Sequence, residues 1–254
     1  MIGKIEDLRL LFKPFHRIEF ITFSNLILIF TISFLSIVLT GCTSTPEPQF
    51  TEVEVTKSQI NTVLENIRNR RTVRKFKSTA IPKEHLQEIL DAARFAPTAG
   101  NLQPWKFVVI QKRQRLDSLK AILQDDWQRT ISNHKDLNED QKKRYIRDGK
   151  IAIENVMTAP VYIMVFVDST VYPDCAVHDG ALAAGYLMLA ARAYGYGTGY
   201  FTSYFPDEVI KSFVKAPENY MFICCTPVGI PEEWPDTPPK KALEEFIVFD
   251  KFPE

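Results

Sequence analysis

One stretch, residues 161–167, constrains the fold of this chain more than any other feature of its sequence. The stretch reads Val-Tyr-Ile-Met-Val-Phe-Val, is apolar throughout, and is bounded by Pro160 and Asp168. A strand with one side facing solvent would alternate apolar and polar residues, and this stretch does not. We therefore predict a strand here that is buried on both faces.

Strands and helices are predicted to alternate along the rest of residues 57–254. β-Branched and aromatic residues favour further strands, at residues 106–111, 198–202 and 220–228. Apolar spacing and helix-start signals favour helices, at residues 58–69, 82–93, 179–194 and 207–215. The charged stretch 114–158 is predicted to be mostly helical, with a break near residues 133–138, and to form a mobile cover over the functional site.

The helix predicted at residues 179–194 is apolar around its whole circumference. Its large apolar residues include Leu182, Tyr186, Leu187 and Leu189. A helix of this kind is expected to be buried on every side, either within a large core or at an interface between subunits. The sequence alone leaves both possibilities open.

Charge and cysteine content argue against two kinds of partner. The chain has 31 basic and 31 acidic residues, so its charge gives no indication of nucleic-acid binding. Cys175, Cys224 and Cys225 show neither a Cys-x-x-Cys spacing nor a histidine at the spacing of metal ligands, and no metal site is predicted. Cys224 and Cys225 lie within the apolar run 220–225 and are predicted to pack in the core.

Residues 1–41 have the organisation of an export signal. The first 17 residues are basic, through Lys4, Arg9, Lys13 and Arg17. Residues 18–39 are almost entirely apolar and are long enough to cross a bilayer, which needs about 20 residues. Small residues then precede a cysteine in the sequence Leu-Thr-Gly-Cys, which ends at Cys42.

The Leu-Thr-Gly-Cys sequence resembles the signal of bacterial lipoproteins, in which Cys42 would be diacylated and become the mature N-terminus. An uncleaved membrane anchor is the alternative. In both cases the basic flank stays in the cytoplasm and the rest of the chain is exported, to a periplasmic face or to the cell surface. Residues 42–56 contain two prolines and several charges and are predicted to be a linker, which leaves residues 57–254 as one domain.

Three arginines and a threonine form a candidate phosphate-binding segment, Arg70-Arg71-Thr72-Val73-Arg74. A guanidinium can bind two phosphate oxygens at once, and a hydroxyl adds a short hydrogen bond. The segment follows the predicted end of a helix near residue 69 and is expected to continue as extended chain to Phe76. A solvated helix end is the alternative interpretation.

A second candidate segment, residues 96–105, reads Ala-Pro-Thr-Ala-Gly-Asn-Leu-Gln-Pro-Trp. Its prolines, glycine and asparagine are typical of a loop. The amides of Asn101 and Gln103 can both donate and accept hydrogen bonds, so they suit the edge of a heterocycle such as a flavin. Trp105 is predicted to be a packing aromatic rather than a ligand.

Together and in this order, the two segments resemble those of the FMN-dependent nitroreductase family. That family opens its catalytic domain with Arg-Arg-Ser-x-Arg-x-Phe, here residues 70–76, and continues into Ala-Pro-Ser-x-x-Asn-x-Gln-Pro-Trp, here residues 96–105. The likeness covers residues 57–254. It implies an α+β fold with helices flanking a mixed, mostly antiparallel central sheet. It also implies a homodimer in which a swapped C-terminal strand, residues 244–249, joins the partner's sheet.

The resemblance assigns roles along the two segments. Arg70 and Thr72 would hold the FMN phosphate, and Arg71 would help there or at the ribityl chain. Arg74 would lie near flavin N1 and O2, where a fixed cation stabilises the reduced ring. The loop residues expected to line the other end of the cofactor, often from the partner subunit, are Pro97, Thr98, Ala99, Asn101 and Gln103.

Two further segments carry implied contacts. Residues 195–200 read Gly-Tyr-Gly-Thr-Gly-Tyr and run from helix to strand, the reverse of the dinucleotide-binding fingerprint. Gly195 is expected to cap the helix, and the later glycines would let a planar ligand approach closely. By resemblance the backbone N–H groups of Thr198 and Gly199 would face flavin N5 and O4, which makes these two residues and Arg74 the candidate catalytic residues. Lys240 and Lys241 stand where the family usually offers an arginine to the phosphate.

The predicted function is two-electron reduction of a nitroaromatic, quinone-like or related small acceptor by hydride transfer through FMN, with NAD(P)H or another donor as reductant. Two alternatives stay open. One is another enzyme of the same fold, a dehalogenase or a flavin-consuming enzyme, which a polar substrate-ordering cluster within residues 125–150 would distinguish. The other is a lipid-anchored binding module that has lost its flavin.

Overall fold

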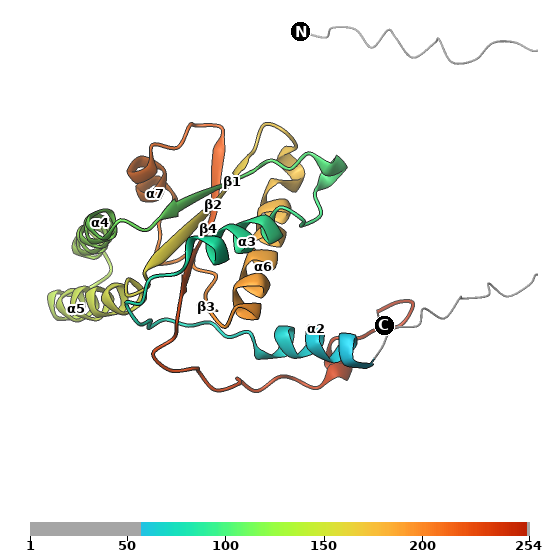
Figure 1. Cartoon of the computed structure of the whole chain (residues 1–254). Helices are drawn as coiled ribbons and strands as arrows, with labels where there is room; N and C mark the ends of the chain where they lie inside the picture. Colours follow the sequence, from blue (N-terminus) through green and yellow to red (C-terminus); the bar gives the residue numbers. More distant parts are fainter. Residues whose placement is uncertain (1–56, 253–254) are drawn as a thin grey trace, which may run out of the picture. The chain divides into compact units, whose positions relative to one another are not determined.

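Four antiparallel strands form the sheet at the centre of the domain (Figure 1). The computed structural model describes residues 57–252, so the predicted signal, Cys42 and the predicted linker lie outside the described residues. The strands are β1 (Trp105–Ile110), β2 (Val161–Asp168), β3 (Gly197–Thr198) and β4 (Tyr220–Gly229), in the spatial order β1-β2-β4-β3. An isolated parallel bridge joins Thr72 to Thr198, which makes the pairing mixed but mostly antiparallel, as predicted.

Strand β2 lies between β1 and β4, and none of residues 161–167 is more than 2% exposed. Successive side chains of a strand point to opposite faces. Tyr162, Met164 and Phe166 therefore pack on one face, and Ile163 and Val165 pack on the other. The predicted double-sided burial of this strand is confirmed.

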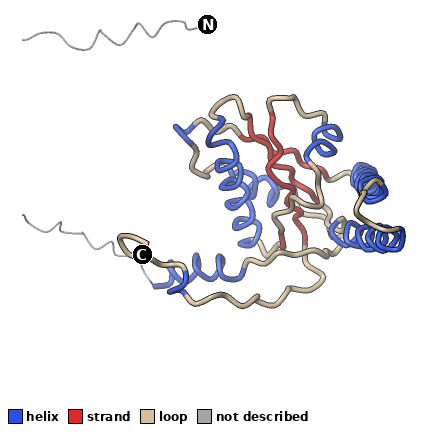
Figure 2. Tube along the Cα trace, turned by 180° about the vertical axis from the view of Figure 1, so that it is seen from behind, coloured by secondary structure: helices blue, strands red, loops and turns tan. Residues whose placement is uncertain are grey.

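Helices cover both faces of the sheet (Figures 1 and 2). They are α2 (Lys57–Asn69), α3 (Lys83–Ala93), α4 (Arg113–Ser132), α5 (Glu139–Val156), α6 (Ala176–Ala193) and α7 (Asp207–Val214). Short 3-10 helices lie at Ala99–Asn101, Pro173–Cys175 and Leu243–Glu245. α4, α5 and α7 share a core with one face of β2, while α3 and α6 pack on the other. No helix among residues 57–252 combines the length and apolar character needed to cross a bilayer.

The predicted break near residues 133–138 separates α4 from α5. Asn138 begins α5 with a reciprocal pair of bonds, in which its side chain accepts from the backbone of Gln141 and the Gln141 side chain accepts from the backbone of Asn138. Leu119 of α4 and Val156 of α5 are buried in the core. The start of α4 and the end of α5 therefore pack in the core beside β2, and the mobile cover stays a prediction.

Helix α6 is buried on one side only within a single chain. Leu187 and Ala191 face the sheet and are fully buried, whereas Leu182 and Tyr186 are 44% and 42% exposed. Burial on every side within the core of one chain is thus contradicted. The remaining possibility, an interface between subunits, stays a prediction.

The C-terminal arm, residues 232–252, forms no strand at residues 244–249 within the single chain. Its regular structure there is the 3-10 helix Leu243–Glu245, and Phe246 and Phe249 are 67% and 82% exposed. A strand exists only when a neighbouring strand pairs with it, and no described strand of the same chain lies beside the arm. The predicted strand is therefore wrong for the isolated chain, and its pairing with a partner's sheet stays a prediction.

Candidate functional site

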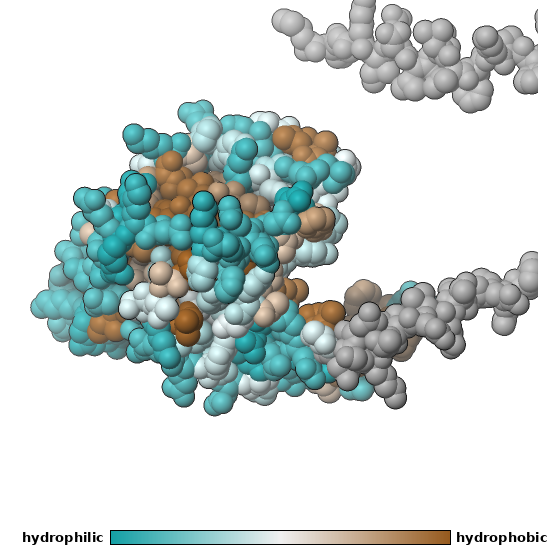
Figure 3. Space-filling view, viewed as in Figure 1, coloured by the Kyte–Doolittle hydropathy of each residue, from teal (hydrophilic) through white to brown (hydrophobic). Residues whose placement is uncertain are grey.

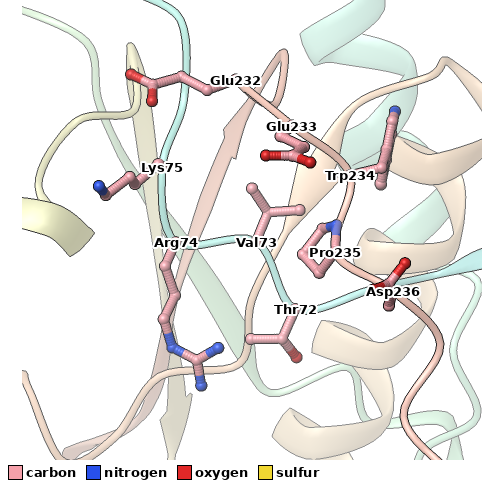
Figure 4. Close-up of a pocket in the computed structure, with 9 residues that line it drawn as sticks. All are labelled: Thr72, Val73, Arg74, Lys75, Glu232, Glu233, Trp234, Pro235 and Asp236. Atoms are coloured by element: carbon pink, nitrogen blue, oxygen red, sulfur yellow. The ribbon is translucent and has the colours of Figure 1, made fainter.

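The arginine segment is an extended stretch fastened to β3. The backbone N–H of Val73 donates to the carbonyl of Thr198 at 2.8 Å. Val73 is buried, and a Cβ on Gly197 would lie only 2.7 Å from its Cγ2, so glycine is needed for this close approach. Because side chains alternate along extended chain, Thr72 and Arg74 point to the side opposite Val73 (Figure 4).

A cavity of about 740 Å³ opens beside this segment, between residues 72–75 and residues 232–236. Its far wall is acidic, through Glu232, Glu233 and Asp236. The guanidinium of Arg74 points away from Glu232 and Glu233 (Figure 4) and lies 6.0 Å from the centre of the Phe201 ring, a residue only 5% exposed. The basic and acidic walls of the cavity thus remain separate.

Arg70 and Arg74 make no ion pair with any carboxylate of residues 57–252. Four of the other nine arginines among these residues pair with a nearby acid, as Arg113 does with Asp117 at 2.5 Å. Two uncompensated guanidiniums beside a hydroxyl provide donors for an anion, which phosphate recognition requires. Thr72 and Arg74 point to the same side of the segment, so one anion could reach both side chains.

Arg71 is occupied differently. Its guanidinium donates to the carbonyls of Arg68 at 2.5 Å and Arg70 at 2.9 Å, and also to the hydroxyl of Thr237. These bonds satisfy a carbonyl at the end of α2 and hold the start of the C-terminal arm. Its predicted help at the phosphate stays a prediction.

A second arginine, which the sequence did not single out, supports the same junction. Arg192 donates to the carbonyl of Asn69 at 3.1 Å and lies 4.2 Å from the ring centre of Trp234. It stands in the last turn of α6, where a cation is favoured by the helix dipole. Arg71 and Arg192 together fix α2, α6 and the arm around the candidate phosphate segment.

The glycines at residues 195–199 are used for internal packing. Gly195 has φ of +80° and its N–H donates to the carbonyl of Arg192, which confirms the predicted helix cap. A Cβ on Gly199 would lie 2.6 Å from the Phe201 ring. Side chains of the same chain lie close to Gly197 and Gly199, and this packing alone accounts for both glycines. Their predicted role in the approach of a planar ligand stays a prediction.

The amide loop, residues 97–103, has a constrained backbone. Gly100, Asn101 and Gln103 have φ of +56°, +55° and +49°, a conformation that costs non-glycine residues energy. The loop is closed by the Gln103 N–H, which donates to the Thr98 hydroxyl at 3.2 Å. Such strain persists at functional sites when the surrounding structure enforces it.

Trp105 is 9% exposed and stacks near Phe107, with ring centres 6.5 Å apart. Its interpretation as a packing aromatic is therefore confirmed. Pro97, Thr98 and Ala99 precede the left-handed residues, and the N–H of Ala99 donates to Asp179 of α6 at 3.3 Å. The sequence did not predict this contact, although an acidic residue in a mostly apolar helix was a signal for it.

The two halves of the candidate site lie at opposite ends of α6 (Figure 1). The loop at residues 97–103 contacts Asp179 in the first turn of the helix, whereas Thr198 and Gly199 follow its last turn. A helix of 18 residues is about 27 Å long at 1.5 Å per residue. A single chain therefore does not bring Asn101 and Gln103 to Arg74.

Lys240 and Lys241 lie on the exposed arm beyond Thr237. Lys241 pairs with Glu245 at 3.8 Å, and both side chains are largely exposed. Within the single chain, both lysines therefore lie on a solvated segment of the arm. No described contact joins either lysine to Arg70 or Thr72, so their role at the phosphate stays a prediction.

The chain matches the model of the nitroreductase family over residues 67–230. It belongs to the nitroreductase family. The resemblance drawn from the arginine and amide segments is thereby confirmed at the level of family and fold.

Its curated relatives within the family have different activities. The chain is 29% identical to an iodotyrosine deiodinase of Thermotoga neapolitana over 185 residues, covering 71% of this chain and 93% of the relative. It is 28% identical to the 5,6-dimethylbenzimidazole synthase of Rhodospirillum rubrum over 175 residues, covering 65% and 79%. Similarity at this level therefore does not single out one reaction.

A solved relative shows the same fold. The structure of a nitroreductase with bound FMN from Desulfitobacterium hafniense superposes with a TM-score of 0.58 at 24% identity. The superposition covers 75% of this chain and 99% of that one. The α+β fold predicted from the sequence is therefore the fold of this family.

The three cysteines of the described residues hold no reactive pair. Cys224 and Cys225 are fully buried and point to opposite faces of β4. Burial raises the pKa of the Cys224 thiol to about 12 and the pKa of Cys225 well above its ordinary value. Among residues 57–252, no three His, Cys, Asp or Glu side chains are grouped so as to hold a metal ion.

We predict that in a protein of residues 50–254 only Cys175, which is partly exposed, reacts with Ellman's reagent at pH 8. The other two thiols should react only after unfolding, because their raised pKa keeps them protonated. The same pKa shift makes stability depend on pH. As the pH rises past about 9, the thiols ionise in the unfolded chain but stay protonated in the folded one, so the free energy of unfolding falls. Three thiols reacting at equal rates in native protein would contradict this.

Proposed function

We propose that this nitroreductase-family enzyme binds FMN and reduces a small nitroaromatic or quinone-like acceptor by two electrons, with NAD(P)H or another reductant as donor. The observation that carries the proposal is the placement of Thr72 and Arg74 on one side of an extended segment fastened to Thr198. Arg70 and Arg74 add two positive charges that no described carboxylate neutralises.

The residues present fit a flavin mononucleotide. Its phosphate needs charged donors and a hydroxyl, which Arg70 and Thr72 offer. The acidic wall at residues 232–236 would repel a phosphate, so the phosphate belongs on the side of the segment to which Thr72 and Arg74 point.

FMN, when bound, supplies the two-electron chemistry at its N5 atom. Arg74 would hold a fixed positive charge beside the ring and so stabilise the negative charge that reduction leaves. The buried Phe201 ring below Arg74 excludes water from one side of that charge, which strengthens its effect. Backbone N–H groups of Thr198 and Gly199 would orient the reacting edge.

Two chains would complete each site in our proposal. The amide loop lies at the far end of α6 from Arg74, so its predicted contacts require a second copy of the chain. Large apolar side chains are exposed on several elements that could form the interface: Val63 and Ile67 of α2, Leu182 and Tyr186 of α6, and Phe246, Phe249 and Phe252 of the arm. A few apolar residues are visible beside α2 in Figure 3, and exposed apolar patches mark interaction sites.

Residues 125–150, where a substrate-ordering cluster would distinguish a dehalogenase, contain several side-chain pairs. Arg129 pairs with Asp126 at 2.5 Å, and Lys150 bonds Gln128 at 2.6 Å. Arg147 pairs with its neighbour Asp148 at 3.0 Å. Other charged side chains of α4 and α5, such as Arg144, pair with no described carboxylate, so residues 125–150 leave a polar substrate open as the alternative.

We also propose that the enzyme is an exported lipoprotein, modified at Cys42. The basic start, the apolar run and the Leu-Thr-Gly-Cys sequence support this location. The linker at residues 42–56 would then separate the domain from a membrane surface. An exported site meets little NAD(P)H, so a donor other than a nicotinamide is compatible with this placement.

The purified domain, residues 50–254, is expected to show the absorbance bands of oxidised flavin and to release FMN on heating. Arg70→Ala should weaken FMN about 10- to 100-fold and leave riboflavin binding unchanged, because it removes only a phosphate contact. Arg74→Ala should weaken both flavins. Lys77→Ala is the matched control, since Lys77 is an exposed basic residue of the same stretch that does not line the cavity. A colourless protein that does not take up FMN would contradict the proposal.

The loaded enzyme should be bleached by a reductant without oxygen and recover its colour when an acceptor is added. NADH, NADPH and dithionite serve as donors, and nitrofurazone, menadione and 3-iodotyrosine as acceptors. Recovery with the first two acceptors at rates well above that with 3-iodotyrosine is the expected result. Recovery with 3-iodotyrosine alone would move the assignment to reductive dehalogenation.

A mixed dimer tests whether two chains build each site. One chain carries Arg70→Ala and Arg74→Ala; the other carries Asn101→Gly and Gln103→Gly, which keep the left-handed backbone but remove both amides. Neither parent dimer should hold FMN tightly. The purified heterodimer should hold one FMN per two chains, because one of its sites combines the two intact halves. If each site belongs to a single chain, the heterodimer will hold none.

Cys42→Ser should abolish lipidation of the full-length chain. Cells labelled with radioactive palmitate are expected to incorporate label into the wild-type protein and none into the variant. Cys175→Ser is the matched control and should be labelled like the wild type. Membrane association of an unlabelled Cys42→Ser chain at wild-type level would favour the uncleaved anchor instead.

A further inference from the structure

Asp179 is the one charged side chain that is buried among the described residues, with an exposed fraction of 4%. It lies in the first turn of α6. Its Oδ1 accepts the N–H of Ala99 at 3.3 Å, whereas its Oδ2 has no hydrogen-bond partner among residues 57–252. A buried carboxylate oxygen without a partner is unfavourable, because it loses its hydration and gains no bond in return.

The surroundings of Asp179 would accept an apolar side chain. Trp105, Val165 and Ala183 form the buried apolar cluster at this end of the sheet. The neighbouring Gly180 is packed so closely that its Cβ would lie 2.5 Å from Ile223. The helix N-terminus favours a negative charge, but that preference is modest and does not require burial. The carboxylate is therefore explained by what it binds rather than by packing.

What Asp179 binds is the start of the constrained loop. Ala99 immediately precedes Gly100 and Asn101, whose backbones are left-handed. The bond from the Gln103 N–H to Thr98 closes the loop on itself but does not attach it to the rest of the domain. The bond from Ala99 to Asp179 provides that attachment and directs it to a rigid helix rather than to another loop.

We propose that Asp179 is a positioning residue for the flavin, which holds loop 97–103 in the shape that presents the amides of Asn101 and Gln103. It acts through Ala99 and does not touch the cofactor. This inference rests on the proposed function: within the chain, Gln103 Nε2 donates to Asn101 Oδ1 at 3.3 Å, and a bound flavin would give the remaining amide groups a ligand. The negative charge strengthens the bond to the backbone N–H beyond what a neutral acceptor would give.

The hydrogen bond from Ala99 to Asp179 is tested first, without flavin, by amide hydrogen exchange in the full-length protein purified in detergent. Asp179→Ala is expected to raise the exchange rate at residues 98–103 at least about tenfold, since it removes the acceptor of Ala99. Asp179→Asn keeps an acceptor without the charge and should give a smaller rise. Thr226→Val, which removes a buried hydroxyl of β4 away from the loop, is the control and should leave these rates unchanged. Unchanged loop exchange in Asp179→Ala would overturn the proposal.

Flavin affinity then tests positioning. Asp179→Ala should weaken FMN and riboflavin by the same factor, about tenfold, because the loop contacts the ring end that both share. Arg70→Ala, by contrast, should weaken FMN alone. Wild-type affinity for both flavins in Asp179→Ala would overturn the inference. If Asp179→Ala does not fold, Asp179→Asn is measured in its place. A loss of affinity that is the same for FMN and riboflavin, and smaller than about tenfold, would support the inference. Unchanged affinity for both flavins would overturn it.

The two measurements separate this inference from the proposed function. If the wild-type protein binds neither flavin, the proposed function fails, and the positioning role of Asp179 fails with it. This holds even if hydrogen exchange shows that Asp179 holds the loop. If the wild type binds FMN and Arg70→Ala weakens it while the Asp179 variants do not, only the positioning role fails.

Discussion

The double-sided burial of β2 is the constraint on which the rest of the structure depends. A strand without a polar face must be covered by strands on both edges and by helices on both faces. Its even-numbered residues, such as Met164, require the layer of α4 and α5, and its odd-numbered residues, such as Ile163, require α3 and α6. The position of α6 follows from that requirement, and α6 in turn separates the two halves of the candidate site.

Helix α6 works as a rigid spacer. Its first turn holds the amide loop through Asp179, and its last turn is joined to the arginine segment through Arg192 and Asn69. The two sets of polar groups are therefore held at a fixed separation that one chain cannot close. Its exposed face carries Leu182 and Tyr186, so the helix that separates the two halves also offers an apolar surface for a second chain.

The arginines of residues 70–74 differ in the partners of their guanidinium groups. Arg71 is committed to backbone carbonyls and to Thr237, and it fixes the geometry of the junction. Arg70 and Arg74 are left without a described carboxylate partner, although acidic residues line the same cavity. Keeping charges of opposite sign apart on separate walls preserves the positive side for an anionic ligand.

The sequence by itself determined the family and most of the helices and strands, because these depend on local patterns: the apolar run at β2, the break between α4 and α5, and the order of the arginine and amide segments. Tertiary structure alone decided which face of α6 is buried, that the arm forms no strand in one chain, and that Asp179 anchors the loop. Each of these depends on groups far apart in sequence, since a strand needs a partner and a buried carboxylate needs a donor. No local pattern records where those partners lie.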